Sequence, residues 1–247
     1  MRLTPPKTTK YSEVEYYRSI LPIVNYINSQ FKDLVMPKAE KVLDGDLDTL
    51  DDAIKALVSK VDKKINFKLI SKIAASSVNK IHKRNSILWK KKLAGFAISI
   101  KGKESFEGEQ EYIRSRIQTN VKLITNLKEE YLNSLAVDVG LAYEQGKTSS
   151  SLTKIIQNKY GVEKRKAKLI ARNEVKNTNT QLNTKQAKEL GFDEVVWLTA
   201  GDERVRSEHK KHNRKSYKLG VGLSDGKGGK EEPGDAINCR CTFYIDI

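Results

Sequence analysis

The spacing of the apolar residues changes once along the chain, at Gly191, and this change constrains the fold more than any other feature. Before Gly191, apolar residues recur at steps of three and four, which is the spacing of one face of an α-helix. After it, the segments "DEVVWLTA" (193–200) and "CTFYIDI" (241–247) are rich in β-branched and aromatic residues and have the length of strands. The sequence therefore predicts a mainly α fold, in which a body of long helices precedes a small α+β C-terminal module.

The helical part divides at its proline, glycine and capping residues. Pro22 predicts a kink or a restart in the first helix, and Asp46 or Asp48 is the expected N-cap of the second. Gly161 is expected to end a short helix, and the glycine-rich stretch 219–235 is expected to be a loop. The predicted helices cover residues 11–31, 44–65, 67–100, 111–145, 147–161 and 162–190, with a loop over 101–110.

These elements predict three consecutive parts in the chain. An N-terminal helical region with a basic stripe is expected over 1–105, and a helical body over 106–190. The small α+β module is expected over 191–247. The longest apolar run is far shorter than a bilayer span, and the first ten residues lack the apolar block of a secretory signal. A cytoplasmic origin without a membrane partner is therefore expected.

The positive charge of the chain is concentrated in one segment. The formal net charge is +15, and residues 55–103 hold 14 Lys or Arg against one acid, Asp62. A helix that is merely solvated usually mixes charges of both signs, so this composition favours an anionic partner such as DNA, bound through its phosphates. A solvated face is the simpler alternative. The expected DNA contacts are Lys63, Lys64, Lys68, Lys72, Lys80, Lys83, Arg84, Lys90, Lys91 and Lys92.

The two cysteines of the chain, Cys239 and Cys241, lie two residues apart near the end of the sequence. Residues at this spacing in a strand point the same way, and His209 and His212 would share one face of a helix. The four side chains, with Asp202 as a substitute ligand, could hold a structural zinc ion, which is the one cofactor that the sequence suggests. Two reduced cysteines packed as small apolar side chains are the alternative, and a strained disulfide is a weaker one.

Five charged residues of the C-terminal part are also expected to form ion pairs. Arg172 and Glu174 belong to the last predicted helix, and Asp202, Arg204 and Arg206 follow the first strand. We expect a buried polar network that fixes the helix against the sheet, since an unpaired buried charge is costly. The alternative is a catalytic group acting on phosphate esters.

The order of these pieces resembles the C-terminal module of the Mu F-like minor head proteins, or head morphogenesis proteins, of tailed bacteriophages. The resemblance covers roughly residues 110–247. Asn173 stands where the family usually has Thr or Ser. The matching positions are Ala171, Arg172, Asn173 and Glu174; Gly191 and Trp197; Asp202, Arg204, Val205, Arg206 and His209; Pro233 and Gly234; and Cys239, Arg240 and Cys241.

The resemblance implies a minor structural protein of the phage head rather than an enzyme. Its implied partners are the portal protein and double-stranded phage DNA, with a scaffold or major capsid protein as a further candidate. The implied location is the head interior or the portal vertex, after assembly in the host cytoplasm. Two alternatives stay open: a metal-dependent nuclease using Asp202, Glu174 and His209, and a non-specific DNA-binding protein outside any capsid.

Overall fold

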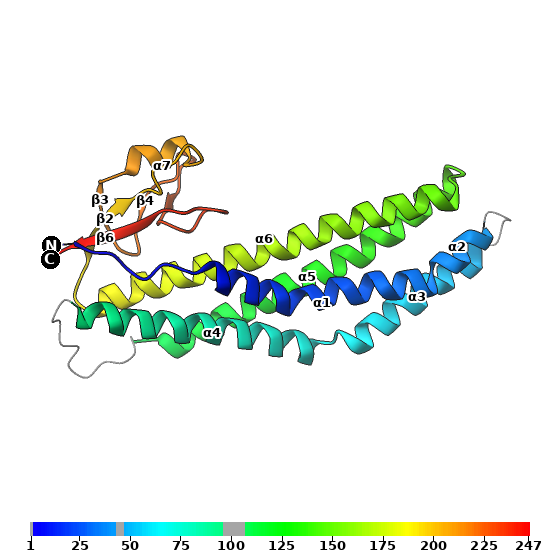
Figure 1. The fold of residues 1–247 in the computed structure, drawn as a ribbon, viewed down its shortest axis with the longest axis horizontal. Coiled ribbons are helices and arrows are strands. Elements are labelled where there is room, and N and C mark those ends of the chain that lie inside the picture. The colour runs from blue at the N-terminus through cyan, green and yellow to red at the C-terminus, as the bar shows by residue number, and fades with distance from the viewer. Residues whose placement is uncertain (1, 43–46, 96–106) are drawn as a thin grey trace. The chain divides into compact units, whose positions relative to one another are not determined.

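The computed structural model of the protein describes residues 2–42, 47–95 and 107–247. It is mostly helical with a small C-terminal sheet, so the predicted fold class is confirmed (Figure 1). The main helices are α1 (Lys10–Leu34), α3 (Leu47–Lys64), α4 (Phe67–Ala94), α5 (Glu109–Glu144) and α6 (Ser149–Glu189), with the short α2 (Met36–Val42) and α7 (Ser207–His212). None of the described helices is long and apolar enough to cross a membrane.

The structure corrects the restart at Pro22 and the helix end at Gly161, while a kink at Pro22 stays a prediction. The helix α1 runs through Pro22 without a restart. The helix α6 runs through Gly161, so the predicted end at that glycine is wrong. One glycine in a helix costs about 1 kcal/mol, and packing on both sides of Gly161 offsets a cost of that size. The proposed N-cap Asp46 and most of the loop 101–110 lie outside the described residues, whereas the other N-cap candidate, Asp48, lies inside α3 and is not its cap.

The chain forms two compact units that interleave along the sequence. We call residues Val14–Ser77 and Ile117–Ala171 the helical unit, and residues Met1–Glu13, Val78–Arg116 and Arg172–Ile247 the module unit. The long helices α4, α5 and α6 each contribute to both units because they cross the boundary between them. Whether the three predicted consecutive parts fold separately stays a prediction.

The helical unit is built around one apolar face from each long helix. Ile20, Ile27 and Phe31 of α1 are fully buried, as are Ile124 and Leu135 of α5. Polar side chains are paired inside this core, since the Tyr16 hydroxyl donates to the amide oxygen of Asn120. The spacing of three and four residues that predicted the helices therefore also marks the side chains that pack.

The module unit contains a four-stranded antiparallel sheet in the order β1-β6-β2-β3. The strands β2 (Glu194–Leu198) and β6 (Thr242–Asp246) confirm the two strands expected after Gly191. Trp197 lies opposite Phe243 in their register, and both side chains are fully buried. The sheet is completed by β1 (Arg2–Leu3) and β3 (Ser216–Lys218).

Two strand pairings of the module unit were not predicted. The strand β1 comes from the start of the chain and pairs with β6, so the N and C ends lie side by side (Figure 1). The expected loop 219–235 contains a small hairpin of β4 (Leu223–Ser224) and β5 (Lys230–Glu231). Gly222 permits its tight start, because a Cβ atom there would lie 2.2 Å from the carbonyl oxygen of Glu231.

Candidate metal centre and basic surface

The helix α7 brings two histidines against the central tryptophan of the sheet. His209 and His212 are both buried and face the same side, as their spacing predicted. Their rings meet Trp197 edge-on, with centroid distances of 5.4 Å for His209 and 5.0 Å for His212. The orientation of the two imidazoles is therefore fixed by packing against one aromatic side chain.

His209, Cys239 and Cys241 form a buried cluster that could hold a metal ion. The Nδ1 atom of His209 lies 3.5 Å from the Sγ atom of each cysteine. Its Nε2 atom lies 2.7 Å from Oε1 of Glu231 on β5. Because a carboxylate accepts, the tautomer with its proton on Nε2 matches Glu231 and directs the lone pair of Nδ1 toward the two sulfur atoms. Metal-binding histidines commonly donate their second ring N–H to a carboxylate, and this hydrogen bond fixes the orientation of the ring.

Backbone groups and the second sulfur favour the thiolate form of Cys239. The Cys241 thiol beside it is the largest cause that lowers the pKa of Cys239 to about 6, although burial opposes the shift. The backbone N–H groups of Gly234 and Cys241 each donate to Cys239 Sγ at 3.4 Å. The hydrogen bond with Cys239 and burial both raise the pKa of Cys241.

The donor atoms already lie at the spacing that zinc requires. Zinc binds sulfur at about 2.3 Å and nitrogen at about 2.0–2.1 Å in a tetrahedron, which separates the two ligand atoms by about 3.5 Å. The two measured nitrogen–sulfur distances agree with this value. Both cysteines are free thiols, and neither forms the disulfide that was considered as the weaker alternative. Three donor atoms of the type that zinc prefers therefore lie within 4.8 Å of one another.

The other two candidate ligands lie apart from this cluster. His212 uses its Nε2 atom at 2.8 Å from the carbonyl oxygen of Ser224. Asp202 accepts two hydrogen bonds from the Arg240 guanidinium, which hold the pKa of this carboxyl below its usual value. Among the described residues, the candidate metal centre consists of one histidine and two cysteines.

The structure does not join the five expected network residues into one network. Glu174 is paired with Arg116 of α5, and Arg172 lies 3.7 Å from Glu13. Arg206 donates instead to the carbonyl oxygen of Ile237 at 2.6 Å. Only Asp202 and Arg204 meet, at 3.8 Å, in a largely exposed pair. The helix and the module are therefore stabilised by separate local pairs.

The segment 233–238 packs closely against α6 in the module unit. Gly234 has a φ of +100°, and a Cβ atom there would lie 2.4 Å from the Thr180 hydroxyl. Asn238 N donates to the side-chain oxygen of Asn173 at 3.0 Å, and Gln181 donates to Asp235 at 2.8 Å. Asn, Ser and Thr all offer a side-chain oxygen, so Asn173 can accept as the residues usual at this position would.

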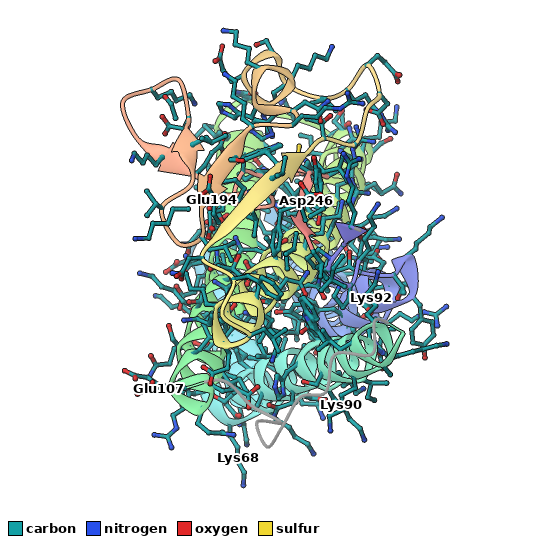
Figure 2. The ribbon with its side chains drawn as sticks, turned by 90° about the vertical axis from the view of Figure 1, so that its left-hand side faces the viewer. Lys68, Lys90, Lys92, Glu107, Glu194 and Asp246 are labelled. Carbon is teal, nitrogen blue, oxygen red and sulfur yellow. The ribbon has the colours of Figure 1, made fainter. Side chains whose placement is uncertain are left out.

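Most of the expected DNA contacts lie on one helix. Eight of the ten are on α4, which has no acidic residue, while Lys63 and Lys64 lie in the last turn of α3. Lys90 points outward from α4 in Figure 2. Arg84 is engaged, since it stacks on Tyr11 at 4.8 Å and donates to Ser12 at 3.2 Å. At 3.6 residues per turn, the six exposed lysines of α4 lie within about 140° of its circumference. These six, named the lysine face, are Lys68, Lys72, Lys80, Lys83, Lys90 and Lys91.

Sequence reasoning missed the residues that support the metal cluster. Glu231 lies in a stretch that was expected to be loop, and the adjacent Glu232 offered the same chemistry in the sequence. Glu232 instead accepts from the backbone N–H of Gly220 at 2.7 Å. Glu231 ends β5 and Glu232 follows it, so the choice between the two carboxylates depends on a short strand that the sequence did not predict.

Comparison with known proteins identifies the C-terminal part of the chain. A family model described as "Phage Mu protein F like protein" matches residues 133–244. An "Uncharacterized protein" of Haemophilus influenzae (strain KW20 / Rd) is 26% identical over 123 residues, which are 50% of this chain and 27% of the relative. The chain thus covers about a quarter of that relative's length. No solved structure matches the chain.

Proposed function

Because residues 133–244 form a Phage Mu protein F-like domain, we propose that the protein is a minor structural component of the head of a tailed bacteriophage. The family match is the observation that carries this proposal, and the resemblance noted in the sequence agrees with it. The proposed roles are head morphogenesis and the packaging or ejection of DNA. The proposed partners are the portal protein and phage DNA, with a scaffold or major capsid protein as a further candidate.

The proposal is tested on particles of the phage that encodes the chain. We expect mass spectrometry to detect the protein in purified procapsids and virions, at few copies per particle. Particles assembled on a portal protein that lacks its inner surface should contain less of it. Absence from both kinds of particle would favour the non-specific DNA-binding protein outside a capsid.

The lysine face supports a contact with DNA. Its six side chains are exposed on a helix that holds eight Lys or Arg and no acid, so the local field attracts polyanions. Such a face contacts phosphates and reads no bases, because only a point charge is offered at each position. The proposed binding is therefore independent of sequence.

Replacing the lysine face by glutamine should remove most of the affinity for a short DNA duplex. Six phosphate contacts imply a loss of about 10³-fold in affinity between about 50 and 200 mM salt, and each lost contact lowers the slope of log K against log salt by about 0.9. Fluorescence anisotropy across a salt series measures both quantities.

A matched variant separates the lysine face from net charge. It carries six other exposed lysines changed to glutamine, so the total charge falls equally: Lys122, Lys147, Lys154, Lys168, Lys210 and Lys227. This control should keep most of the affinity and the steep slope. Equal losses in the two variants would contradict a localised DNA contact.

We propose a non-enzymatic role because the candidate nuclease residues are separately engaged. Asp202 is bound by Arg240, Glu174 by Arg116, and His209 lies between Glu231 and the cysteines. Within the described part of the chain, no group of carboxylates converges as a magnesium site would require. Cleavage of supercoiled plasmid with Mg²⁺ or Mn²⁺ that is lost in Asp202→Ala would favour the nuclease instead.

We further propose that the cluster of His209, Cys239 and Cys241 holds a structural zinc ion. The proposal is supported by the 3.5 Å spacing, by the carboxylate behind the histidine and by the two backbone donors to Cys239. Binding of zinc to the two cysteines would release their thiol protons. It would connect α7 to the segment that leads into β6.

A further inference from the structure

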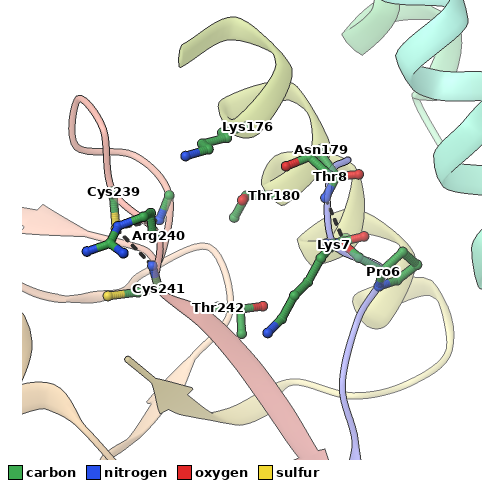
Figure 3. A pocket seen from close by; sticks show the side chains of 12 residues that line it. Pro6, Lys7, Thr8, Lys176, Asn179, Thr180, Cys239, Arg240, Cys241 and Thr242 are labelled. Atoms are coloured by element: carbon green, nitrogen blue, oxygen red, sulfur yellow. Dashed lines mark hydrogen bonds between the residues drawn. The ribbon is translucent and has the colours of Figure 1, made fainter. Parts of the chain in front are cut away.

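A polar pocket of about 180 Å³ opens in the module unit beside the cysteine segment. Three segments frame it: the N-terminal stretch 6–8, α6 between Lys176 and Asn183, and the stretch 239–242 (Figure 3). The pairing of β1 with β6 holds the start of the chain beside its last strand. Residues near both ends of the sequence can therefore line one pocket. The lining residues are Pro6, Lys7, Thr8, Lys176, Asn179, Thr180, Asn183, Gly234, Cys239, Arg240, Cys241 and Thr242.

The basic residues that line this pocket outnumber its one potential anion, the Cys239 thiolate. Lys7, Lys176 and Arg240 contribute three positive charges, and the lining contains no carboxylate. Arg240 is neutralised by Asp202, whereas Lys176 reaches its nearest carboxylate, Glu13, only at 3.8 Å. No ion pair of Lys7 is found in the described part of the chain. The pocket therefore keeps an excess of positive charge.

The surroundings of Lys176 agree with this excess. Burial is the main cause that lowers the pKa of Lys176, and the cations Arg172 and Arg240 act in the same direction, against Glu13 and Cys239. An anion in the pocket would offset both effects, because it would add negative charge beside this partly buried ammonium group.

The uncharged lining offers hydroxyl groups rather than amides. The side-chain amides of Asn179 and Asn183 both donate to the carbonyl oxygen of Pro6 at 2.9 Å, so they are already engaged. Thr8, Thr180 and Thr242 line the same space with hydroxyls that can donate. Ammonium and hydroxyl donors around a small space are suited to an oxyanion with several acceptor oxygens.

We propose that this pocket binds a phosphoryl group. Its volume is below the roughly 300–1,000 Å³ of pockets that enclose a drug-sized ligand, so one phosphate fits better than a whole nucleotide. The group can come from free phosphate or from the backbone of DNA, which share this chemistry. The site does not include the lysine face, so the proposal goes beyond the DNA contact described above.

Calorimetric titration of the full-length protein with inorganic phosphate, at constant ionic strength against chloride, tests the proposal. Wild type should bind about one phosphate per chain with saturable heat. The double variant Lys7→Gln/Lys176→Gln should bind at least ten-fold more weakly. The single variant Lys7→Gln changes only an exposed side chain and should therefore stay folded. It should show a smaller loss of phosphate affinity than the double variant. Lys10→Gln, an exposed lysine outside the pocket, should bind as wild type does.

A second titration with a short DNA duplex distinguishes the two sources. If the pocket receives a backbone phosphate, the double variant loses DNA affinity and free phosphate competes with DNA. If it receives a free anion, DNA affinity is unchanged while phosphate binding falls, and either result supports the site. Absence of saturable phosphate binding, or equal binding by wild type and the folded Lys7→Gln and double variants, would overturn it.

Discussion

Loss of zinc is expected to unfold the C-terminal module, and His209→Gln should reproduce that loss. Apparent binding free energies of structural zinc sites reach about 10–16 kcal/mol at neutral pH, and this free energy contributes directly to folding. We therefore expect wild type to contain one zinc per chain and to melt at a markedly lower temperature after chelation. His209→Gln should contain no zinc and should melt at the same temperature with or without a chelator.

His212→Gln provides the matched control for this prediction. His212 is buried on the same short helix and contacts the same tryptophan, but it lies outside the metal cluster. This variant should lose the ring contact with Trp197 and the hydrogen bond to Ser224, of which the latter contributes about 0.5–1.5 kcal/mol, and should retain its zinc. A wild-type protein that is free of zinc after refolding with the metal, and that is indifferent to chelation, would contradict the assignment.

Trp197→Ala is expected to lower the free energy of unfolding by about 3–5 kcal/mol. Trp197 is fully buried at the centre of the sheet, where it contacts the rings of His209, His212 and Tyr217. Removing it leaves a cavity and frees the His209 ring, so zinc retention should fall as well. Urea denaturation followed by circular dichroism, with metal analysis of the same samples, measures both effects.

Two further variants show whether the effect comes from packing in the sheet. Trp197→Phe keeps an aromatic ring in the same place, so it should lose less stability than the alanine variant. Ile87→Ala, at a position that is 55% exposed on α4, should change the free energy of unfolding by no more than about 0.5 kcal/mol. The role assigned to Trp197 fails if its alanine variant is no less stable than Ile87→Ala.

The sequence predicted the parts of the fold that depend on local periodicity. The helices α1, α3, α4 and α5 follow the spacing of their apolar residues, and β2 and β6 follow their β-branched and aromatic composition. The continuity of α6 was missed because Gly161 is unfavourable locally while packing at both ends is not visible in the sequence. The two-residue strand β1 was missed because its hydrogen bonds come from the other end of the chain.

The candidate site was predictable to a similar extent. The spacing of His209, Cys239 and Cys241 indicated a shared centre, and the structure brings these three side chains together. The same spacing argument included His212, but the nearby carbonyl oxygen of Ser224 binds that ring instead. Asp202 was a reasonable ligand by type, yet its charge is already matched by Arg240. Long-range partners of this kind cannot be read from residue spacing.

The place of β6 in the sheet has a consequence for biosynthesis. This strand lies between β1 and β2, yet it is made after all the other strands. The ribosome must therefore release residues 242–246 before β1 can find its pairing partner, and until then the apolar side chain of Leu3 stays uncovered. The sheet of the module unit closes as a late step, after synthesis of the long helices, and truncation within β6 should leave nascent chains prone to aggregation.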